Sequence, residues 1–430
     1  MTRTAAAGVA HRLADVLSTV LGAAELPVRV RAWDGSEAGP ADAPLLVVGS
    51  PQALRRILWS PNELGLARAY VAGEIDLPGD LFAALAALTS ARLLAGTGQQ
   101  PSPPGARERW RLLTRVVALG AVGRKPPPPP EEVDLARQGR RHSGRRDAAA
   151  IAHHYDLSND FYALVLGPSL VYSCAVWEDE QTGLEAAQAA KIDLVCRKLD
   201  LQPGMRVLDV GCGWGSFALH AAERYGVDVV GITLSAAQAT LARKRVTSAG
   251  LDGSVDIRVQ DYRELDDGPF DAISSIGMAE HVGRAEIGGY ANRLHDLLRP
   301  GGRLLNHAIA WNAGYAYADP NTFIARYVFP DAEILNLGET IGALQFADLE
   351  ILDVEALRRH YALTLRAWAQ RLEDHWTEAV RLVGESRARV WRLYLAGSAL
   401  AFETGKEGVN QVLVQRPGGA EPPLRRTAWI

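Results

Sequence analysis

Residues 207–215, with the sequence VLDVGCGWG, constrain the fold of this chain more than any other stretch. An apolar run typical of a buried parallel strand leads into a glycine-rich turn, and a helix is expected to follow. Gly211 and Gly213 let the backbone adopt positive φ and approach a ligand closely, because they carry no Cβ. Asp209 ends the strand with a carboxylate. The GxGxG spacing differs from the GxGxxG of dinucleotide sites, so it predicts a nucleotide-cofactor site of another kind. A turn without a ligand is the structural alternative.

Strand and helix patterns alternate after this turn. Residues 218–225 and 235–248 are expected to form helices, and strands are expected at 228–233, 255–259 and 270–276. This alternation predicts a parallel, doubly wound sheet that binds its ligand at the carboxyl ends of the strands. The second of these strands ends in a threonine and a leucine rather than in the acid that often binds ribose hydroxyls. Thr233 or Gln238 is therefore expected to hold the ribose.

Four further segments make a family resemblance specific. They are HYDLSNDFY at 154–162, YSCAVW at 172–177, GMAEHVG at 277–283 and LNHAI at 305–309. The glycine turn resembles motif I of the class I S-adenosylmethionine (SAM) methyltransferases. Taken together and in this order, the five motifs resemble the cyclopropane fatty acid synthase family. The resemblance continues through 326–330 and 359–365, and so covers about residues 150–417.

This resemblance implies a class I methyltransferase (Rossmann-like) α/β fold: a doubly wound sheet with a helical lipid-pocket subdomain and a small N-terminal α/β domain. It implies SAM as the cofactor. The positions that match the family's cofactor site are Tyr172, Ser173, Asp209, Gly211, Gly213, Thr233, Leu234, Gln238, Asp261 and Tyr262. Among these, Asp209 is expected to act indirectly, by ordering the glycine loop.

The resemblance also implies how a proton is removed. An alkene is a poor nucleophile, so the enzyme must align it with the methyl group of SAM and exclude water from the cation that forms. Enzymes of the family use a bound bicarbonate ion as the base, held by a Cys, a Glu, a His and a Tyr. The matching positions are Cys174, Glu280, His307 and Tyr361. Glu280 is expected to accept from the bicarbonate OH, His307 to orient or relay the proton, and Tyr361 to donate to an anionic oxygen.

Each catalytic candidate has a structural alternative. Cys174 lies in an apolar segment and could be an ordinary core cysteine, and its expected contribution is a backbone N–H or its small size. Tyr361 could pack at the start of a helix, and Glu280 could cap one. The joint match of four residue types at family positions favours function. His153, His154 and His281 are expected to be structural or to lie beside SAM.

Two departures from the family pattern bear on the product. The family glutamate usually follows a Phe, whereas Ala279 stands here, and Asn306 precedes the histidine. With residues 423–426, these resemble an actinobacterial branch that makes 10-methylene acyl chains, the precursors of 10-methylstearate. A separate reductase would then be needed. The alternatives are a cyclopropane synthase acting on the same phospholipid, an inactive lipid-binding subunit on the same scaffold, and a small-molecule C- or N-methyltransferase.

Composition limits location and partners. The formal net charge of -4 gives no nucleic-acid footprint. Cys174, Cys196 and Cys212 form neither a disulfide framework nor a metal-binding pair, which fits a reducing compartment, and no metal site is expected. No stretch approaches the roughly 20 apolar residues of a membrane span. The sequence predicts a cytoplasmic protein that is peripheral at the inner face of the plasma membrane.

Three regions are expected along the chain: an N-terminal α/β module at 1–98, a Pro/Arg-rich linker at 99–147 and a catalytic domain at 148–430. The module should have an amphipathic helix at 10–24, strands at 28–33 and 45–48, and helices at 51–59 and 81–93. Similar modules in the family are thought to handle lipid or to pair subunits, so a homodimer is expected.

The linker combines a proline run at 126–130, which predicts an extended spacer, with many cations. Such a segment is attracted to anionic lipid by about 1 kcal/mol per cation. The alternative is a merely solvated linker. The cations are Arg107, Arg109, Arg111 and Arg115 around Trp110, followed by Arg124, Lys125, Arg137, Arg140, Arg141, Arg145 and Arg146.

Overall fold

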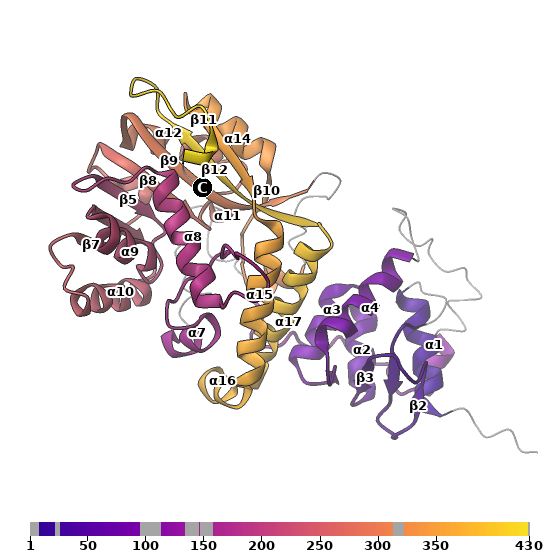
Figure 1. The fold of residues 1–430 in the computed structure, drawn as a ribbon. Coiled ribbons are helices and arrows are strands. Elements are labelled where there is room, and N and C mark those ends of the chain that lie inside the picture. Colours follow the sequence, from indigo (N-terminus) through magenta and orange to yellow (C-terminus); the bar gives the residue numbers. More distant parts are fainter. Residues whose placement is uncertain are drawn as a thin grey trace, which may run out of the picture. The chain divides into compact units, whose positions relative to one another are not determined.

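The computed structural model describes residues 8–21, 26–94, 113–133, 146, 158–312 and 322–428. The chain forms two compact units (Figure 1). The first unit contains Met1–Val133, Asn321–Tyr327 and Gly384–Leu400. The second unit contains Asp134–Pro320, Val328–Val383 and Ala401–Ile430. The first unit therefore takes in two segments that the sequence assigned to the catalytic domain.

The first unit is a small α/β fold. Its sheet has the strand order β2-β1-β3-β4, in which β1 and β3 are parallel and the outer pairs are antiparallel. The expected helix at 51–59 and strand at 45–48 have the bounds predicted from the sequence. The elements are α1 (Val9–Leu21), β1 (Arg29–Arg31), β2 (Glu37–Ala38), β3 (Leu45–Val48), α2 (Pro51–Trp59), α3 (Glu63–Val71), β4 (Ile75–Asp76), α4 (Leu81–Leu94), α13 (Phe323–Tyr327) and most of α17 (Glu385–Glu403).

Residues 113–133, which the sequence placed in the linker, differ from that expectation because they are packed into the first unit. Val116 and Leu119 are buried in the same apolar core as Val30 of β1 and Leu54 of α2. Ala396 of α17 belongs to this core as well. The proline run is thus held against a folded surface, and it is not an independent spacer.

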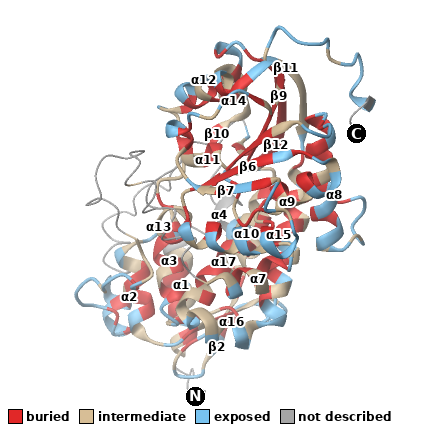
Figure 2. Cartoon of the chain, turned by 90° about the vertical axis from the view of Figure 1, so that its left-hand side faces the viewer, coloured by how far each residue is buried: buried red, intermediate tan, exposed pale blue. Residues whose placement is uncertain are grey.

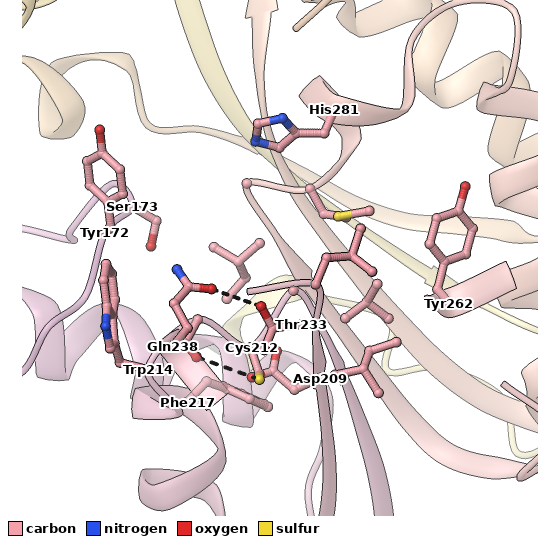
Figure 3. A pocket seen from close by; sticks show the side chains of 18 of the residues that line it. Tyr172, Ser173, Asp209, Cys212, Trp214, Phe217, Thr233, Gln238, Tyr262 and His281 are labelled. Atoms are coloured by element: carbon pink, nitrogen blue, oxygen red, sulfur yellow. Dashed lines mark hydrogen bonds between the residues drawn. The ribbon is translucent and has the colours of Figure 1, made fainter. Parts of the chain in front are cut away.

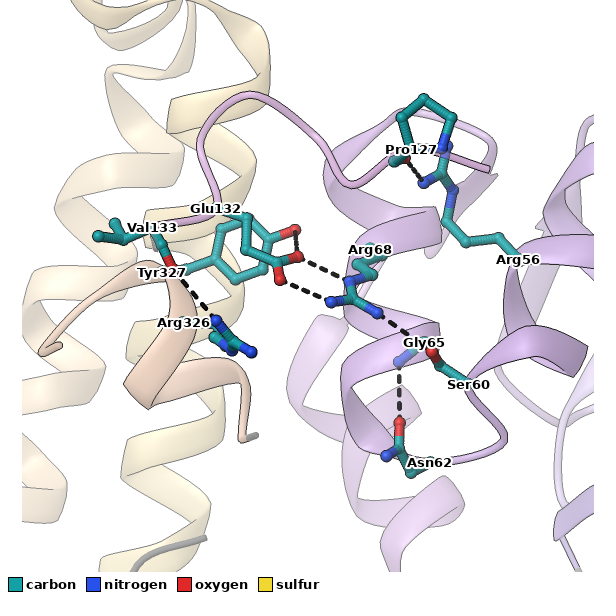
Figure 4. A network of polar contacts seen from close by, with 10 residues as sticks. All are labelled: Arg56, Ser60, Asn62, Gly65, Arg68, Pro127, Glu132, Val133, Arg326 and Tyr327. Carbon is teal, nitrogen blue, oxygen red and sulfur yellow. Dashed lines mark hydrogen bonds and ion pairs between the residues drawn. The ribbon is translucent and has the colours of Figure 1, made fainter. Parts of the chain in front are cut away.

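Polar contacts fix the end of this segment (Figure 4). The guanidinium of Arg68 donates to both carboxylate oxygens of Glu132, each at 2.6 Å, and the hydroxyl of Tyr327 lies 3.2 Å from the same carboxylate. Arg56, whose side chain pairs with Glu74 at 2.8 Å, also donates to the carbonyl of Pro127. Each arginine is largely buried, so these pairs tie the chain after the prolines to α2 and α3.

The second unit is built on a large mixed sheet with the strand order β11-β12-β9-β8-β5-β6-β7, and β10 pairs with β9. The pairs among β5, β6, β7, β8 and β9 are parallel, whereas β12 runs antiparallel between β9 and β11. The strands are β5 (Arg206–Val210), β6 (Asp228–Thr233), β7 (Val255–Val259), β8 (Phe270–Ile276), β9 (Leu298–Trp311), β10 (Leu335–Asn336), β11 (Glu350–Ala356) and β12 (Glu407–Gln415).

Helices cover both faces of this sheet, as the doubly wound prediction requires. On one face, α8, α9 and α10 bury Val207 and Leu305. On the other face, α12 and α14 bury the neighbouring Leu208 and Leu304. The interior strands are accordingly buried along most of their length (Figure 2). The helices are α7 (Asn159–Leu166), α8 (Leu184–Lys198), α9 (Ser216–Tyr225), α10 (Ala236–Ser248), α11 (Ala279–Val282), α12 (Ile287–Leu297), α14 (Leu337–Phe346), α15 (Arg358–Asp374) and α16 (Trp376–Val383), with short 3-10 turns η1 (Tyr262–Glu264) and η2 (Arg426–Ala428).

The expected cation cluster is described only in part. Arg146 forms a two-point ion pair with Asp331, in which Nη2 and Oδ1 are 2.8 Å apart. Its guanidinium is therefore paired with a carboxylate of the second unit. This corrects its assignment to a lipid-facing group. No helix in the described ranges is long and apolar enough to cross a membrane. The following predicted positions lie outside the described residues: Arg107, Arg109, Trp110, Arg111, Arg137, Arg140, Arg141, Arg145, His153 and His154.

Candidate active site

The glycine loop joins β5 to α9. The amides of Gly211 and Cys212 both donate to the carbonyl of Ile232 at 2.9 Å, which closes the turn against β6. Gly211 has φ 78° and Gly213 has φ 55°, conformations that favour glycine. A Cβ added at Gly213 would meet no atom of the described chain within 4 Å. The loop therefore leaves open space beside its backbone, as the sequence predicted.

A pocket lies beside this loop, at the carboxyl ends of β5, β6 and β8 (Figure 3). All ten residues predicted to bind SAM line it, from Tyr172 to Tyr262. His281, expected to be structural or SAM-adjacent, lines it as well. The structure therefore brings the predicted cofactor residues together around one cavity at the expected edge of the sheet.

Thr233 and Gln238, the two candidates for ribose binding, are bonded to each other. The Thr233 hydroxyl donates to Oε1 of Gln238 at 2.8 Å, and it accepts from the amide of Ser235 at 3.1 Å. The hydroxyl of Ser235 in turn caps α10 by accepting from the amide of Gln238. This short network fixes both side chains at the pocket wall.

Asp261 follows β7 and is paired with Arg263. Its carboxylate accepts from Nε of Arg263 at 2.9 Å and from Nη2 at 2.6 Å. The guanidinium also lies 5.6 Å from the ring centre of Tyr262. Tyr262 in turn packs edge-on against Tyr290 of α12, with ring centres 5.6 Å apart. The two predicted residues are therefore held in place by neighbours on η1 and α12.

Lys191 of α8 is a pocket residue that sequence reasoning missed. Its buried ammonium donates to the hydroxyl of Ser173 at 2.9 Å. Burial lowers the pKa of Lys191 to about 8, and nearby Cys174 and Asp209 oppose that shift. Burial raises the pKa of Asp209 to about 7, with Lys191 opposing. No local pattern singled out this lysine, because residues 191–196 mix Lys191 and Asp193 with apolar residues.

The four catalytic candidates lie outside this pocket lining and group in two pairs. Cys174 and Tyr361 meet at one carbonyl. The Leu357 oxygen accepts from the amide of Tyr361 at 3.1 Å, and Sγ of Cys174 lies 3.7 Å from it. The ring of Tyr361 packs on Phe402, with centres 4.7 Å apart. Both side chains are buried, so water has little access to either.

The other two candidates are Glu280 of α11 and His307 of β9, and both are linked to the end of β9. Oε1 of Glu280 accepts from the amide of Ile309 at 2.8 Å, two residues beyond His307 on the same strand. Ile309 pairs with Val409 of β12, whose carbonyl accepts from the amide of Leu357 at 2.8 Å. Through this backbone path the structure connects all four candidates around the ends of β9 and β12.

Burial shifts the pKa values of both Glu280 and His307. Burial raises the pKa of Glu280 to about 7. Burial, together with the ammonium groups of Lys191 and Lys198, lowers the pKa of His307 to about 3. His307 is therefore neutral near neutral pH, where the carboxyl of Glu280 can gain or lose a proton. Within the described residues, Oε2 of Glu280 and Nε2 of His307 have no hydrogen-bond partner.

Asn306 points away from His307, because consecutive residues of a strand face opposite sides of the sheet. Its Oδ1 accepts from the hydroxyl of Tyr290 at 3.0 Å, and that hydroxyl also bonds Ser275 at 2.7 Å. Ala279 is buried in the same apolar core as Tyr290. Any influence of these two residues on the product would therefore be indirect, through Glu280 or β9. Over the described ranges, no three metal-ligating side chains gather.

The sheet order, the glycine loop and the pocket at the strand ends define a class I SAM-dependent methyltransferase. Comparison with known proteins agrees: residues 142–412 match the family described as mycolic acid cyclopropane synthetase, and the chain belongs to that family. The expected family and the fold are thereby confirmed.

Two relatives from Mycobacterium tuberculosis align over nearly the whole chain. The probable fatty acid methyltransferase Rv3720 is 40% identical over 97% of this chain and 98% of its own length. The tuberculostearic acid methyltransferase UfaA1 is 34% identical over 96% of this chain and 92% of its own length. Among solved structures, mycolic acid cyclopropane synthase CmaA1, solved with S-adenosylhomocysteine (SAH), superposes with a TM-score of 0.59 at 34% identity. That match covers 62% of this chain and 98% of the solved one.

Proposed function

We propose that this enzyme transfers the methyl group of SAM to the cis double bond of an unsaturated acyl chain in a membrane phospholipid, and that the product is a 10-methylene chain. One observation carries the proposal: all ten expected cofactor residues line one pocket in a chain of this family. The names of the two full-length relatives, a fatty acid and a tuberculostearic acid methyltransferase, support the acyl substrate and the branched product.

In the proposed reaction the acyl chain gains one methyl group and loses one proton. SAM supplies the methyl group, whose bond to sulfur breaks as a bond to C10 of the alkene forms, and SAH leaves. The acyl chain then carries a cation at C9. A hydride moves from C10 to C9, and loss of a proton from the new methyl group gives the methylene. Buried side chains such as Cys174 and Tyr361 exclude the water that would otherwise quench the cation.

Glu280 and His307 each offer an atom that could hold a small anion. Oε2 of Glu280 accepts hydrogen bonds when ionised and Nε2 of His307 can donate, and both are buried without a partner among the described residues. A buried polar atom without a partner costs about 1–3 kcal/mol, which a bound ligand would recover. We propose bicarbonate as this ligand, since it supplies a base that SAM would not readily methylate.

Two variants test the assignment. Glu280→Gln and Tyr361→Phe should retain SAM affinity, measured by calorimetry, and lose most turnover on vesicles of oleoyl phospholipid. Both residues lie outside the SAM pocket lining, so their effect should fall on proton removal. A loss of SAM affinity large enough to account for the whole loss of activity would contradict their role. Absence of any acyl product from the wild-type protein with SAM would favour the inactive lipid-binding alternative.

We further propose that the first unit contacts the membrane surface through four exposed apolar side chains, Trp59, Leu113, Val117 and Val122, which we call the apolar patch. Each of these side chains is about half exposed, from 49% for Leu113 to 57% for Val117. Trp59 donates from Nε1 to the carbonyl of Gly123 at 3.2 Å, which places it beside Val122. A tryptophan with aliphatic neighbours is typical of an interfacial anchor.

Cations border this patch. Arg124 and Lys125 are exposed and follow Val122 after one glycine, and Arg55 donates to the carbonyl of Ala121 at 3.3 Å. An anionic lipid surface would attract these charges while the apolar side chains enter the headgroup region. Together they support a peripheral enzyme that reaches its phospholipid from one side of the bilayer.

A cyclopropane product is the second candidate. The solved structure of CmaA1 is of a cyclopropane synthase, and Asn306, one of the two departures that favour the methylene, faces Tyr290 rather than His307. The same cation would then lose a methyl proton as that carbon bonds to C9. Both products have the same mass, so proton NMR of the released acyl chain distinguishes a ring from a vinylidene group.

A further inference from the structure

Gln411 is a buried side chain that the proposed reaction has not used. It lies on β12 directly opposite His307 of β9 in the antiparallel register. Its side-chain nitrogen Nε2 is 3.3 Å from Nδ1 of His307, and the residue is fully buried. The contact joins residues that are 104 positions apart in the chain.

The chemistry of the two groups decides where the imidazole proton lies. In the structure Nε2 of the Gln411 amide faces His307, and an amide nitrogen only donates hydrogen bonds, so in this orientation Nδ1 of His307 accepts and carries no proton. A neutral imidazole has one proton in total, which then lies on Nε2. Nε2 has no hydrogen-bond partner in the described part of the chain, so its N–H is available to a ligand. The reverse orientation of the amide would place Oε1 against a protonated Nδ1, and the tautomer measurement below distinguishes the two.

The surrounding charges keep the imidazole neutral. Lys191 and Lys198 of α8 face the same side of the sheet, and burial with these two ammonium groups lowers the pKa of His307 to about 3. Lys198 is itself paired with Asp353 and Glu355 of β11, at 3.3 and 2.6 Å. The two ammonium groups therefore disfavour imidazolium.

We propose that Gln411 is a positioning residue that holds neutral His307 with its proton on Nε2, so that His307 donates a hydrogen bond to an oxygen of the bound anion. The inference rests on the proposed function, because it assigns a role within that site. Of the two roles expected for His307, orienting the anion or relaying its proton, the inference favours the first: His307 donates a hydrogen bond to the anion and does not take up the proton that the anion removes from the substrate. Glu280, whose second oxygen is free of partners among the described residues, remains the side chain that accepts from the anion.

Nitrogen-15 NMR of protein with labelled histidine tests the tautomer without turnover. The signal of His307 is assigned by its loss in His307→Gln. The expected spectrum has a protonated Nε2 and an unprotonated Nδ1 across neutral pH. A protonated Nδ1 in the wild-type protein would overturn the proposal. Since this measurement needs no substrate, a failure of the proposed lipid reaction would leave its result readable.

Gln411→Glu is the decisive variant. A carboxylate only accepts, so it should move the proton to Nδ1 and raise the pKa of His307. Turnover should fall roughly ten- to a hundredfold as pH rises through this new pKa, the size of one hydrogen bond to a charged group. SAM affinity should stay unchanged.

Gln415→Glu is the matched control. Gln415 is buried on the same strand, but it donates to the carbonyl of Ala420 and does not contact His307. It should keep the wild-type pH profile. The same pH profile in both glutamate variants would show that Gln411 has only a structural role.

Discussion

Oε1 of Glu280 accepts a hydrogen bond of 2.8 Å from the backbone amide of Ile309, while Oε2 of the same carboxyl is buried without a partner among the described residues. This geometry fixes the carboxyl at β9 and leaves half of it for a ligand. It also makes ionisation costly, since burial raises the pKa of Glu280 from an ordinary 4.5 to about 7. The stability that the protonated form contributes is complete below about pH 4.5 and is lost as pH rises to about 7.

Glu280→Gln should therefore change the pH dependence of stability. The amide cannot ionise, and its oxygen can still accept from Ile309. The free energy of unfolding of the variant should therefore exceed that of the wild type at pH 8. The gain is on the order of 3 kcal/mol at most, since each pKa unit corresponds to about 1.4 kcal/mol. Chemical denaturation at pH 5 and pH 8 measures it. An equal difference at both values of pH would contradict the assigned burial of the charge.

Gly211→Val should abolish SAM binding. At φ 78° a β-branched residue is strongly disfavoured, and its side chain would enter the space beside the loop. Gly250→Val is the matched control, because Gly250 has φ 70° and lies at the end of α10 away from the pocket. Calorimetric titration with SAM should show binding only in the control. Unchanged affinity in Gly211→Val would mean that the loop is purely structural.

Arg68→Ala should destabilise the first unit. Its removal leaves the largely buried carboxylate of Glu132 without its main partner, a loss that typically costs about 3–5 kcal/mol. Arg31→Ala removes the exposed pair with Glu37 and should cost much less, because water screens exposed ion pairs. Urea unfolding of both variants measures the difference. Similar small losses would mean that the segment after the prolines does not depend on α3.

Membrane binding should depend on the exposed apolar patch and its cations. Val122→Asp, or the double change Arg124→Glu and Lys125→Glu, should weaken co-sedimentation with vesicles that contain anionic phospholipid. The charge reversal should matter most at low salt, because screening acts beyond about 8 Å at physiological ionic strength. SAM affinity should be unaffected. Equal wild-type binding to neutral and anionic vesicles would favour a merely solvated linker.

The sequence also placed Arg140, Arg141, Arg145 and Arg146 in a lipid-facing group. Reversing the first three, which lie outside the described residues, should weaken activity on anionic vesicles in the same way. Arg146→Glu should instead disturb the second unit, because Asp331 would lose its ion-pair partner. A change in stability without a change in vesicle binding is the expected result for that variant.

The product is the remaining test. Oleoyl phospholipid incubated with the enzyme and SAM, without a reductase, should gain the mass of one CH₂ group and show a vinylidene signal in proton NMR. The hydride shift is favoured because it converts a secondary cation to a tertiary one at C10. Cyclopropyl protons without a vinylidene signal would exclude the methylene product and leave SAM-dependent lipid methylation intact.

Local pattern was enough to predict the second unit's first strands and the cofactor loop. Strands at 228–233, 255–259 and 270–276 match β6, β7 and β8, because alternating apolar runs and glycine turns are encoded by near neighbours. The alternation of side chains along a strand also bears on Asn306, although the predicted role of this residue did not take it into account. Its neighbour His307 had to face the other side of the strand, so both could not shape one site directly.

Long-range contacts could not be predicted this way. Nothing near Gln411 in the sequence indicates that it opposes His307, and the burial of Lys191 depends on how α8 packs on the sheet. The proline run suggested a free spacer, whereas Arg56 and Arg68 bind the chain around it. Such contacts arise from tertiary packing, which overrides local composition.

The first unit is built from segments that lie far apart in the chain, and this affects when it can fold during synthesis. Residues 1–133 are synthesised before residues 321–327 and 384–400, which the unit also requires. From that last segment, Ala396 enters its core, and Arg392 donates to the hydroxyl of Tyr70 at 3.1 Å. The fold of this unit can therefore be completed only after residue 400 has been synthesised. A fragment that ends at residue 133 should expose the core surface that Ala396 covers and aggregate, whereas the full chain should not.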